Sequence, residues 1–101
     1  MSNRTISMKK HIGDFAENKD TAKSLRIMII MPALQNNHDV TFDFAGVDGA
    51  TQSFVHALIS EPIREFYGTV FDKLHFKNCN ATIRAVVEVV YEYMQEGLEQ
   101  N

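Results

Sequence analysis

The segment of residues 45–54, AGVDGATQSF, holds the residue types that could do chemistry in this chain. Gly46 and Gly49 allow a positive φ or a close approach of the backbone to another group. The hydroxyls of Thr51 and Ser53 precede a predicted helix, whose free amides favour negative charge. The segment has no Gly-Lys-Ser/Thr and lacks the third glycine of a dinucleotide fingerprint, so neither nucleotide-binding motif is present.

Two roles are open for the hydroxyls of Thr51 and Ser53. Either side chain can cap the following helix, which contributes about 1 kcal/mol. Alternatively, one of them accepts a phosphoryl group, which adds about −1.5 to −2 of charge at pH 7. The spacing favours the cap, and Ser53 and Thr51 are the phosphorylation candidates.

The histidines and the cysteine lack metal-binding spacing. No zinc set is formed by His11, His38, His56, His75 and Cys79. Cys79 precedes a predicted helix, a position that lowers a thiol pKa, but no catalytic partner is identifiable and we predict a structural role. His75 is predicted on a sheet surface, and His56 is predicted to be exposed to solvent.

Two carboxylates, one just before the 45–54 segment and one within it, could take part in catalysis. Asp43 and Asp48 are the only candidates there for an acid pair, and Asp48 is expected to satisfy turn amides. We therefore assign no catalytic residue, metal or cofactor, and expect a protein that is not an enzyme.

Composition argues against nucleic acid and membrane partners. The chain has 10 Lys and Arg against 13 Asp and Glu, for a net charge of −3, whereas phosphate binding usually requires a basic surplus. The basic pairs Lys9-Lys10 and Lys73/Lys77 lack sufficient aromatic interleaving for a nucleic-acid platform. The longest apolar run, residues 27–34, is far shorter than the ~20 residues that span a bilayer. With one cysteine and no visible targeting segment, a cytoplasmic location is expected.

Strands and helices are predicted to alternate along the chain. The strands are expected near residues 5–9, 40–44 and 73–77, and the helices near 21–34, 52–67 and 81–99. Such strands pair in parallel through right-handed crossovers. The prediction is an α/β fold with βαβαβα order, in which helices pack on a small, mainly parallel sheet. We expect one domain over residues 1–101, with a folded surface of about 5,800 Å².

Residues 21–34 have two interpretations. Apolar residues at helical spacing, with a second apolar stripe beside them, indicate a helix buried on more than one side. A buried strand over residues 26–31 is the alternative, but the length of the segment favours the helix. The core is the default location for this apolar surplus, and a dimer interface is the second.

Helix ends are predicted from capping residues. Asp20 and Asn80 are expected to cap the first and last helices. Pro62 is expected to kink the middle helix, or to make it restart after a cap by Ser60. Gly68 is expected to end that helix.

Residues 42–54, FDFAGVDGATQSF, and 76–80, FKNCN, resemble the STAS-like domain family of unknown function. The resemblance extends over about residues 6–94, and the family distantly resembles the STAS domains of anti-sigma-factor antagonists. It implies an α/β sandwich without catalytic machinery that binds an ATPase-fold kinase. Such antagonists are switched by phosphorylation at the start of the helix after the central strand, which corresponds to Ser53, with Thr51 as its neighbour.

The chain departs from the antagonist pattern at two positions. Gln52 stands where an Asp commonly precedes the phosphorylated serine, and Pro62 lies in the helix that forms much of the partner surface. Partner switching is therefore an analogy, because fold alone does not establish function.

The leading hypothesis is a non-enzymatic regulatory module that docks a protein partner, an ATPase or kinase-like regulator. The predicted partner-binding residues are Gly46, Val47, Asp48, Gly49, Gln52, Ser53 and His56. Phosphorylation of Ser53 would weaken docking by adding charge to the contact. The alternative is a structural subunit, a homodimer formed through residues 27–34 without a phosphorylation switch.

Overall fold

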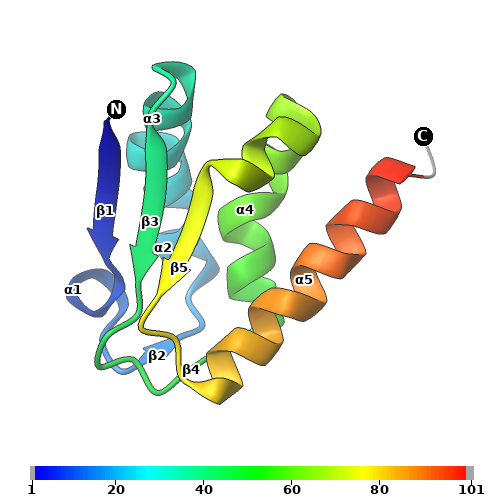
Figure 1. Cartoon of the computed structure of the whole chain (residues 1–101). Coiled ribbons are helices and arrows are strands. Elements are labelled where there is room, and N and C mark those ends of the chain that lie inside the picture. The colour runs from blue at the N-terminus through cyan, green and yellow to red at the C-terminus, as the bar shows by residue number, and fades with distance from the viewer. Residues whose placement is uncertain (1, 100–101) are drawn as a thin grey trace.

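Three parallel strands form the main sheet of the computed structural model, which describes residues 2–99. These are β1 (Asn3–Ser7), β3 (Asp39–Asp43) and β5 (Leu74–Lys77), in the order β1-β3-β5. Ile6 is level with Phe42, and Phe42 with Phe76. Both crossovers step in the same direction, so the connecting helices lie on one face of the sheet (Figure 1). The predicted α/β class and parallel pairing are confirmed.

The helical layer has three parts that lie side by side. The first is a continuous run of α2 (Lys19–Leu25), the π-helical turn η1 (Arg26–Ile30) and α3 (Met31–Gln35). The second is α4 (Gln52–Phe66), which continues into the 3-10 turn η2 (Tyr67–Asp72). The third is α5 (Ala81–Glu99). Helix α4 packs against α2 on one side and against α5 on the other (Figure 1).

The core lies between the sheet and this layer. Because strand side chains alternate between faces, β3 turns Val40 and Phe42 inward, where both are fully buried. The Phe42 and Phe76 rings lie 4.9 Å apart between centroids. Helices α4 and α5 complete the core with Phe54, Leu58, Ile59, Ile63, Ile83, Val87, Val90 and Met94. The solvent-accessible surface is 5906 Å², close to the area expected from chain length.

The other face of the sheet is polar. Thr41 donates a hydrogen bond to the Asn3 side chain at 2.9 Å, and His75 Nε2 lies 2.8 Å from Asp39 Oδ2. Parallel sheets usually have both faces covered, and here the polar pairs make this face compatible with water. The predicted surface position of His75 is confirmed.

The ambiguous residues 21–34 are helical. Ala22, Leu25 and Ile30 are buried, so the helix interpretation is confirmed. Ile27 and Met28, however, are 54% and 75% exposed. The apolar residues of this segment therefore exceed what the core covers.

Several helix ends differ from the predictions. The cap of α2 is Asn18, whose Oδ1 accepts hydrogen bonds from the amides of Asp20 and Thr21. Asp20 instead lies in the first turn, where the helix dipole also favours a carboxylate. The cap of α5 by Asn80 is confirmed by its hydrogen bond from the Ile83 amide at 2.9 Å.

The middle helix shows two further corrections. Helix α4 runs through Pro62 to Phe66 without restarting, so the cap by Ser60 was wrong, and Ser60 is buried within the helix. The residue that leaves the helix at a positive φ of 56° is Tyr67, not Gly68.

The structure contains short elements that the sequence patterns did not predict. The first strand ends at Ser7, and Met8 begins α1 (Met8–Ile12). Residues Phe15–Ala16 form β2, which pairs in parallel with β4, Gly49–Ala50. Two residues are too few to show a periodicity. Within residues 2–99, no helix has both the length and the apolarity to cross a bilayer.

Candidate functional site

The 45–54 segment starts at the carboxyl end of β3, where Asp43 organises the turn. Its Oδ1 accepts hydrogen bonds from the Ala45 amide at 3.0 Å and from the Asn78 side chain at 2.9 Å. These bonds, the Asn78 bond foremost, and the Lys77 charge lower the pKa of Asp43. Asp43 therefore satisfies the turn amide, the role predicted for Asp48.

Lys9 of α1 holds the next part of the segment. Its Nζ forms an ion pair with Asp14 and donates to the Gly46 carbonyl at 3.2 Å. Gly46 has a φ of +80°, and a Cβ there would lie 2.9 Å from Lys9 Cδ. The Asp48 amide donates to the Asp14 carbonyl at 2.7 Å. The turn is thus fixed by contacts with the chain around α1.

The middle of the segment is covered. Val47 is 4% exposed, and a Cβ on Gly49 would lie 2.6 Å from the Phe15 ring. Asn80 donates to the Asp48 carbonyl at 2.8 Å. The exposed predicted residues therefore fall into two groups: Gly46 and Asp48 near Lys9, and the residues that begin α4.

The two hydroxyls at the start of α4 have different environments. Thr51 Oγ1 accepts a hydrogen bond from the Phe54 amide at 3.1 Å, so Thr51 is the cap. Ser53 is exposed in the first turn. Within the described residues, the Ser53 hydroxyl has no hydrogen-bond partner. Of the two phosphorylation candidates, only Ser53 has a hydroxyl that is free for another role.

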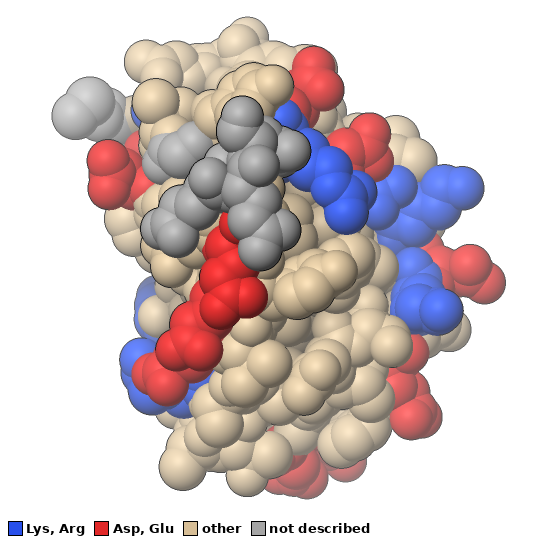
Figure 2. Space-filling view, turned by 90° about the vertical axis from the view of Figure 1, so that its right-hand side faces the viewer, with Lys and Arg blue, Asp and Glu red and all other residues tan. Residues whose placement is uncertain are grey.

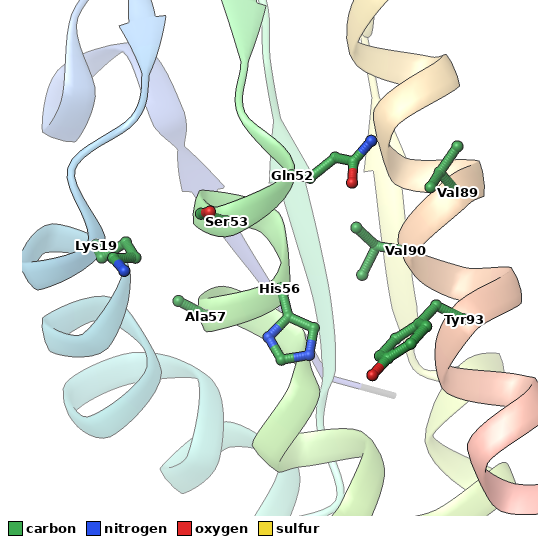
Figure 3. A pocket seen from close by; sticks show the side chains of 8 residues that line it. All are labelled: Lys19, Gln52, Ser53, His56, Ala57, Val89, Val90 and Tyr93. Carbon is green, nitrogen blue, oxygen red and sulfur yellow. The ribbon is translucent and has the colours of Figure 1, made fainter.

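Ser53 lies in a groove of about 440 Å³ that crosses from α2 over α4 to α5. Two other predicted residues, Gln52 and His56, line the same groove. His56 was predicted to be exposed but is half-buried, and its ring lies 6.0 Å from the Tyr93 ring between centroids. The remaining lining residues are Lys19, Ala57, Val89 and Val90 (Figure 3).

Helix α5 supplies the part of the groove that the sequence did not indicate. Val89 is 47% exposed and Tyr93 is 64% exposed. Figure 2 views the molecule from the α5 side, where a ridge of acidic side chains adjoins a broad surface without charge. Helix α5 buries Ile83, Val87, Val90 and Met94. Nothing in the spacing of its apolar residues distinguishes an exposed Val or Tyr that lines a groove.

Neither Cys79 nor the histidines and carboxylates form a second candidate site among the described residues. Burial raises the pKa of the Cys79 thiol, which corrects the lower pKa expected before a helix. Within residues 2–99, no group of three or more His, Cys, Asp or Glu side chains is placed to hold a metal ion.

Comparison with protein families found one family model that matches this chain. A family model described as a STAS-like domain of unknown function matches residues 21–84, which is more than half of the chain. The match includes β3, α4 and β5 and ends in the first turn of α5. Searches of the curated proteins and of the solved structures found no match.

Proposed function

Because the chain belongs to the family of STAS-like domains of unknown function, we propose that it is a regulatory module that binds a protein partner. We place the docking surface at the groove that crosses from α2 over α4 to α5. The observation that carries this proposal is the exposure of Val89 and Tyr93 beside Ala57 and Val90 in that groove. Aromatic residues on exposed apolar surfaces are typical anchors of protein interfaces.

The proposed partner is an ATPase or kinase-like regulator, and the module acts by binding rather than by catalysis. The resemblance to anti-sigma-factor antagonists supports this class of partner. Ser53 is the proposed phosphorylation switch, because its free hydroxyl lies in the groove at the first turn of α4. A phosphate there would add charge to the docking surface.

The test begins in the native host. Intact-mass analysis should find a singly phosphorylated form, and fragmentation should place the phosphate on Ser53. An ATPase-fold kinase encoded beside this chain would be the binding probe, measured by calorimetry. We expect Tyr93→Ser to weaken binding at least tenfold, since an anchor side chain contributes roughly 2 kcal/mol or more.

A matched control separates docking from general surface effects. Tyr67 is 66% exposed at the other end of α4, and Tyr67→Gly removes the side chain at a residue whose φ of 56° and ψ of −153° glycine adopts without strain. This variant should bind normally. Equal affinities for the wild type, Tyr93→Ser and the Ser53-phosphorylated protein would refute the docking surface and the switch.

A second function, self-association, is favoured by a separate observation. The π-helical turn presents Ile27 and Met28, which are exposed by 54% and 75%. Ile29 and Pro32 continue this surface in a hollow that also includes Arg4. We propose a second copy of the chain as the occupant, since a two-fold axis brings the same patch of both copies together.

A further inference from the structure

Lys19 and Ser53 lie on neighbouring helices and line the same groove. Lys19 is the first residue of α2, which packs against α4. Figure 3 shows the Ser53 hydroxyl on the side of α4 that faces α2 and Lys19. Among the side chains that the structure describes, no carboxylate lies within 4.0 Å of the Lys19 ammonium, whereas Lys9, Lys73 and Lys77 each have an acidic partner. Lys19 is therefore a cation at this groove without a counter-ion.

We infer that Lys19 is the internal counter-ion of a phosphate on Ser53, so that the modified side chain occupies the end of the groove instead of projecting into solvent. This inference rests on the proposed switch at Ser53 and specifies how that switch would work. A phosphoserine carries three acceptor oxygens and nearly two charges, and an ammonium on a flexible stem can follow such a group.

The surroundings of Ser53 support this arrangement. Ser53 is the second residue of α4, and Thr51 already occupies the Phe54 amide. The amides that begin the helix therefore add positive potential beside Lys19. The other titratable side chains that line the groove are His56 of α4 and Tyr93 of α5. No carboxylate is among the lining residues, so nothing in the groove opposes the phosphate.

The mechanism differs from simple repulsion of a partner. Once paired with Lys19, the phosphate fills space next to His56 and Ala57, where a partner side chain would otherwise dock. Docking is then blocked by occupancy of the groove, and the Lys19 ammonium offsets about half of the added charge.

The experiment uses the whole chain with phosphoserine installed at position 53 during synthesis. Phosphorus NMR follows the second ionisation of the phosphate, whose ordinary pKa is about 6. Since an ammonium favours the dianion, Lys19→Gln should raise this pKa by roughly 0.2–0.7 units, the equivalent of one exposed ion pair. Lys19→Arg should retain the wild-type value.

Lys23 is the matched control, because it lies one turn further along α2 and does not line the groove. Lys23→Gln should leave the phosphate pKa unchanged. Equal midpoints for the wild type and Lys19→Gln would overturn the inference, as would a shift of the same size in Lys23→Gln. Because the phosphate is synthetic and no partner is present, these results are independent of whether cells phosphorylate Ser53 or of what the groove binds.

Discussion

At the residue scale, the start of α4 separates a structural hydroxyl from a free one. Thr51 and Ser53 are two positions apart and both suit a helix cap, so sequence could not distinguish them. The structure does, because the residue before the first helical turn has an extended backbone, with φ −86° and ψ 155° at Thr51. That geometry aims the Thr51 hydroxyl back at the Phe54 amide.

This difference leads to the first stability test. We expect Thr51→Ala to lower the free energy of unfolding by about 1 kcal/mol, because the Phe54 amide loses its acceptor. Thr51→Ser should keep most of the stability, and Ser53→Ala should be neutral within about 0.5 kcal/mol. Urea unfolding of the three variants measures these values. A larger loss in Ser53→Ala than in Thr51→Ala would show that the cap is assigned to the wrong residue.

A pH dependence follows from Asp43. Its folded-state pKa is lowered by the Asn78 hydrogen bond first, then by the Ala45 amide and the Lys77 charge. The ionised carboxylate therefore stabilises the fold above the unfolded-state pKa, and this contribution is lost as the pH falls through the folded-state pKa. Asn78→Gly should raise the Asp43 pKa, and stability should then fall less between neutral and acidic pH.

Glycine is chosen at position 78 so that the substitution removes the side chain without straining the backbone. Asn78 has a φ of +58°, which glycine adopts without strain. Carbon NMR of the Asp43 carboxyl group gives the pKa directly. Lys77→Met should raise the pKa less, because Lys77 Nζ is 4.0 Å from Asp43 Oδ2. An Asp43 pKa that does not change in Asn78→Gly would contradict the assignment.

At the element scale, the long periodic segments were predictable and the short ones were not. The apolar residues Ile83, Val87, Val90 and Met94 of α5 recur at helical spacing, and Val40 and Phe42 alternate along β3, so each pattern repeats often enough to define a buried face. Strands β2 and β4 have two residues each, and they pair next to the hydrogen bond from the Asp48 amide to the Asp14 carbonyl. The π-helical turn η1 could not be predicted either. Its hydrogen bonds join residues five apart, but the residues there form a continuous apolar run in which no spacing can be recognised.

Helix α5 offers a test of its exposed face. Glu88, Glu92 and Glu96 are exposed at four-residue spacing, and each adjacent pair repels by roughly 0.2–0.5 kcal/mol. Glu92→Lys turns both repulsions into attractions, so we expect a gain of about 0.8–2 kcal/mol in thermal or urea unfolding. Glu92→Gln should give about half of that gain, and added salt should reduce it. A destabilised Glu92→Lys protein would mean that Glu92 has a favourable partner on another element.

At the scale of the whole molecule, the candidate site joins elements that are far apart in sequence. Gln52, Ser53 and His56 were among the partner-binding residues predicted for the segment after β3 and the start of the following helix. Lys19, Val89 and Tyr93 were not, because their positions in the groove depend on how α2 and α5 flank α4. The prediction from the 45–54 segment therefore included groove residues of α4 and omitted those of α2 and α5.

The same arrangement separates the two apolar surfaces. Ile27 and Met28 lie on η1, at the first part of the helical layer, whereas Val89 and Tyr93 lie on α5, at the third, and α4 runs between them (Figure 1). A two-fold dimer through Met28 would therefore leave the groove of each copy free. The two proposed functions, self-association and partner docking, are therefore compatible with each other.

Sedimentation velocity over a wide concentration range tests this separation. We expect the wild type to associate as concentration rises, and Met28→Lys to remain monomeric because a buried ammonium without a partner opposes the contact. Tyr93→Ser should associate like the wild type, since the α5 surface is not used between copies. Met28 and Tyr93 are both exposed, so neither substitution should change stability by more than about 0.5 kcal/mol. A wild-type chain that stays monomeric at every concentration would exclude the dimer and leave the α4–α5 groove as the remaining docking surface proposed for this chain.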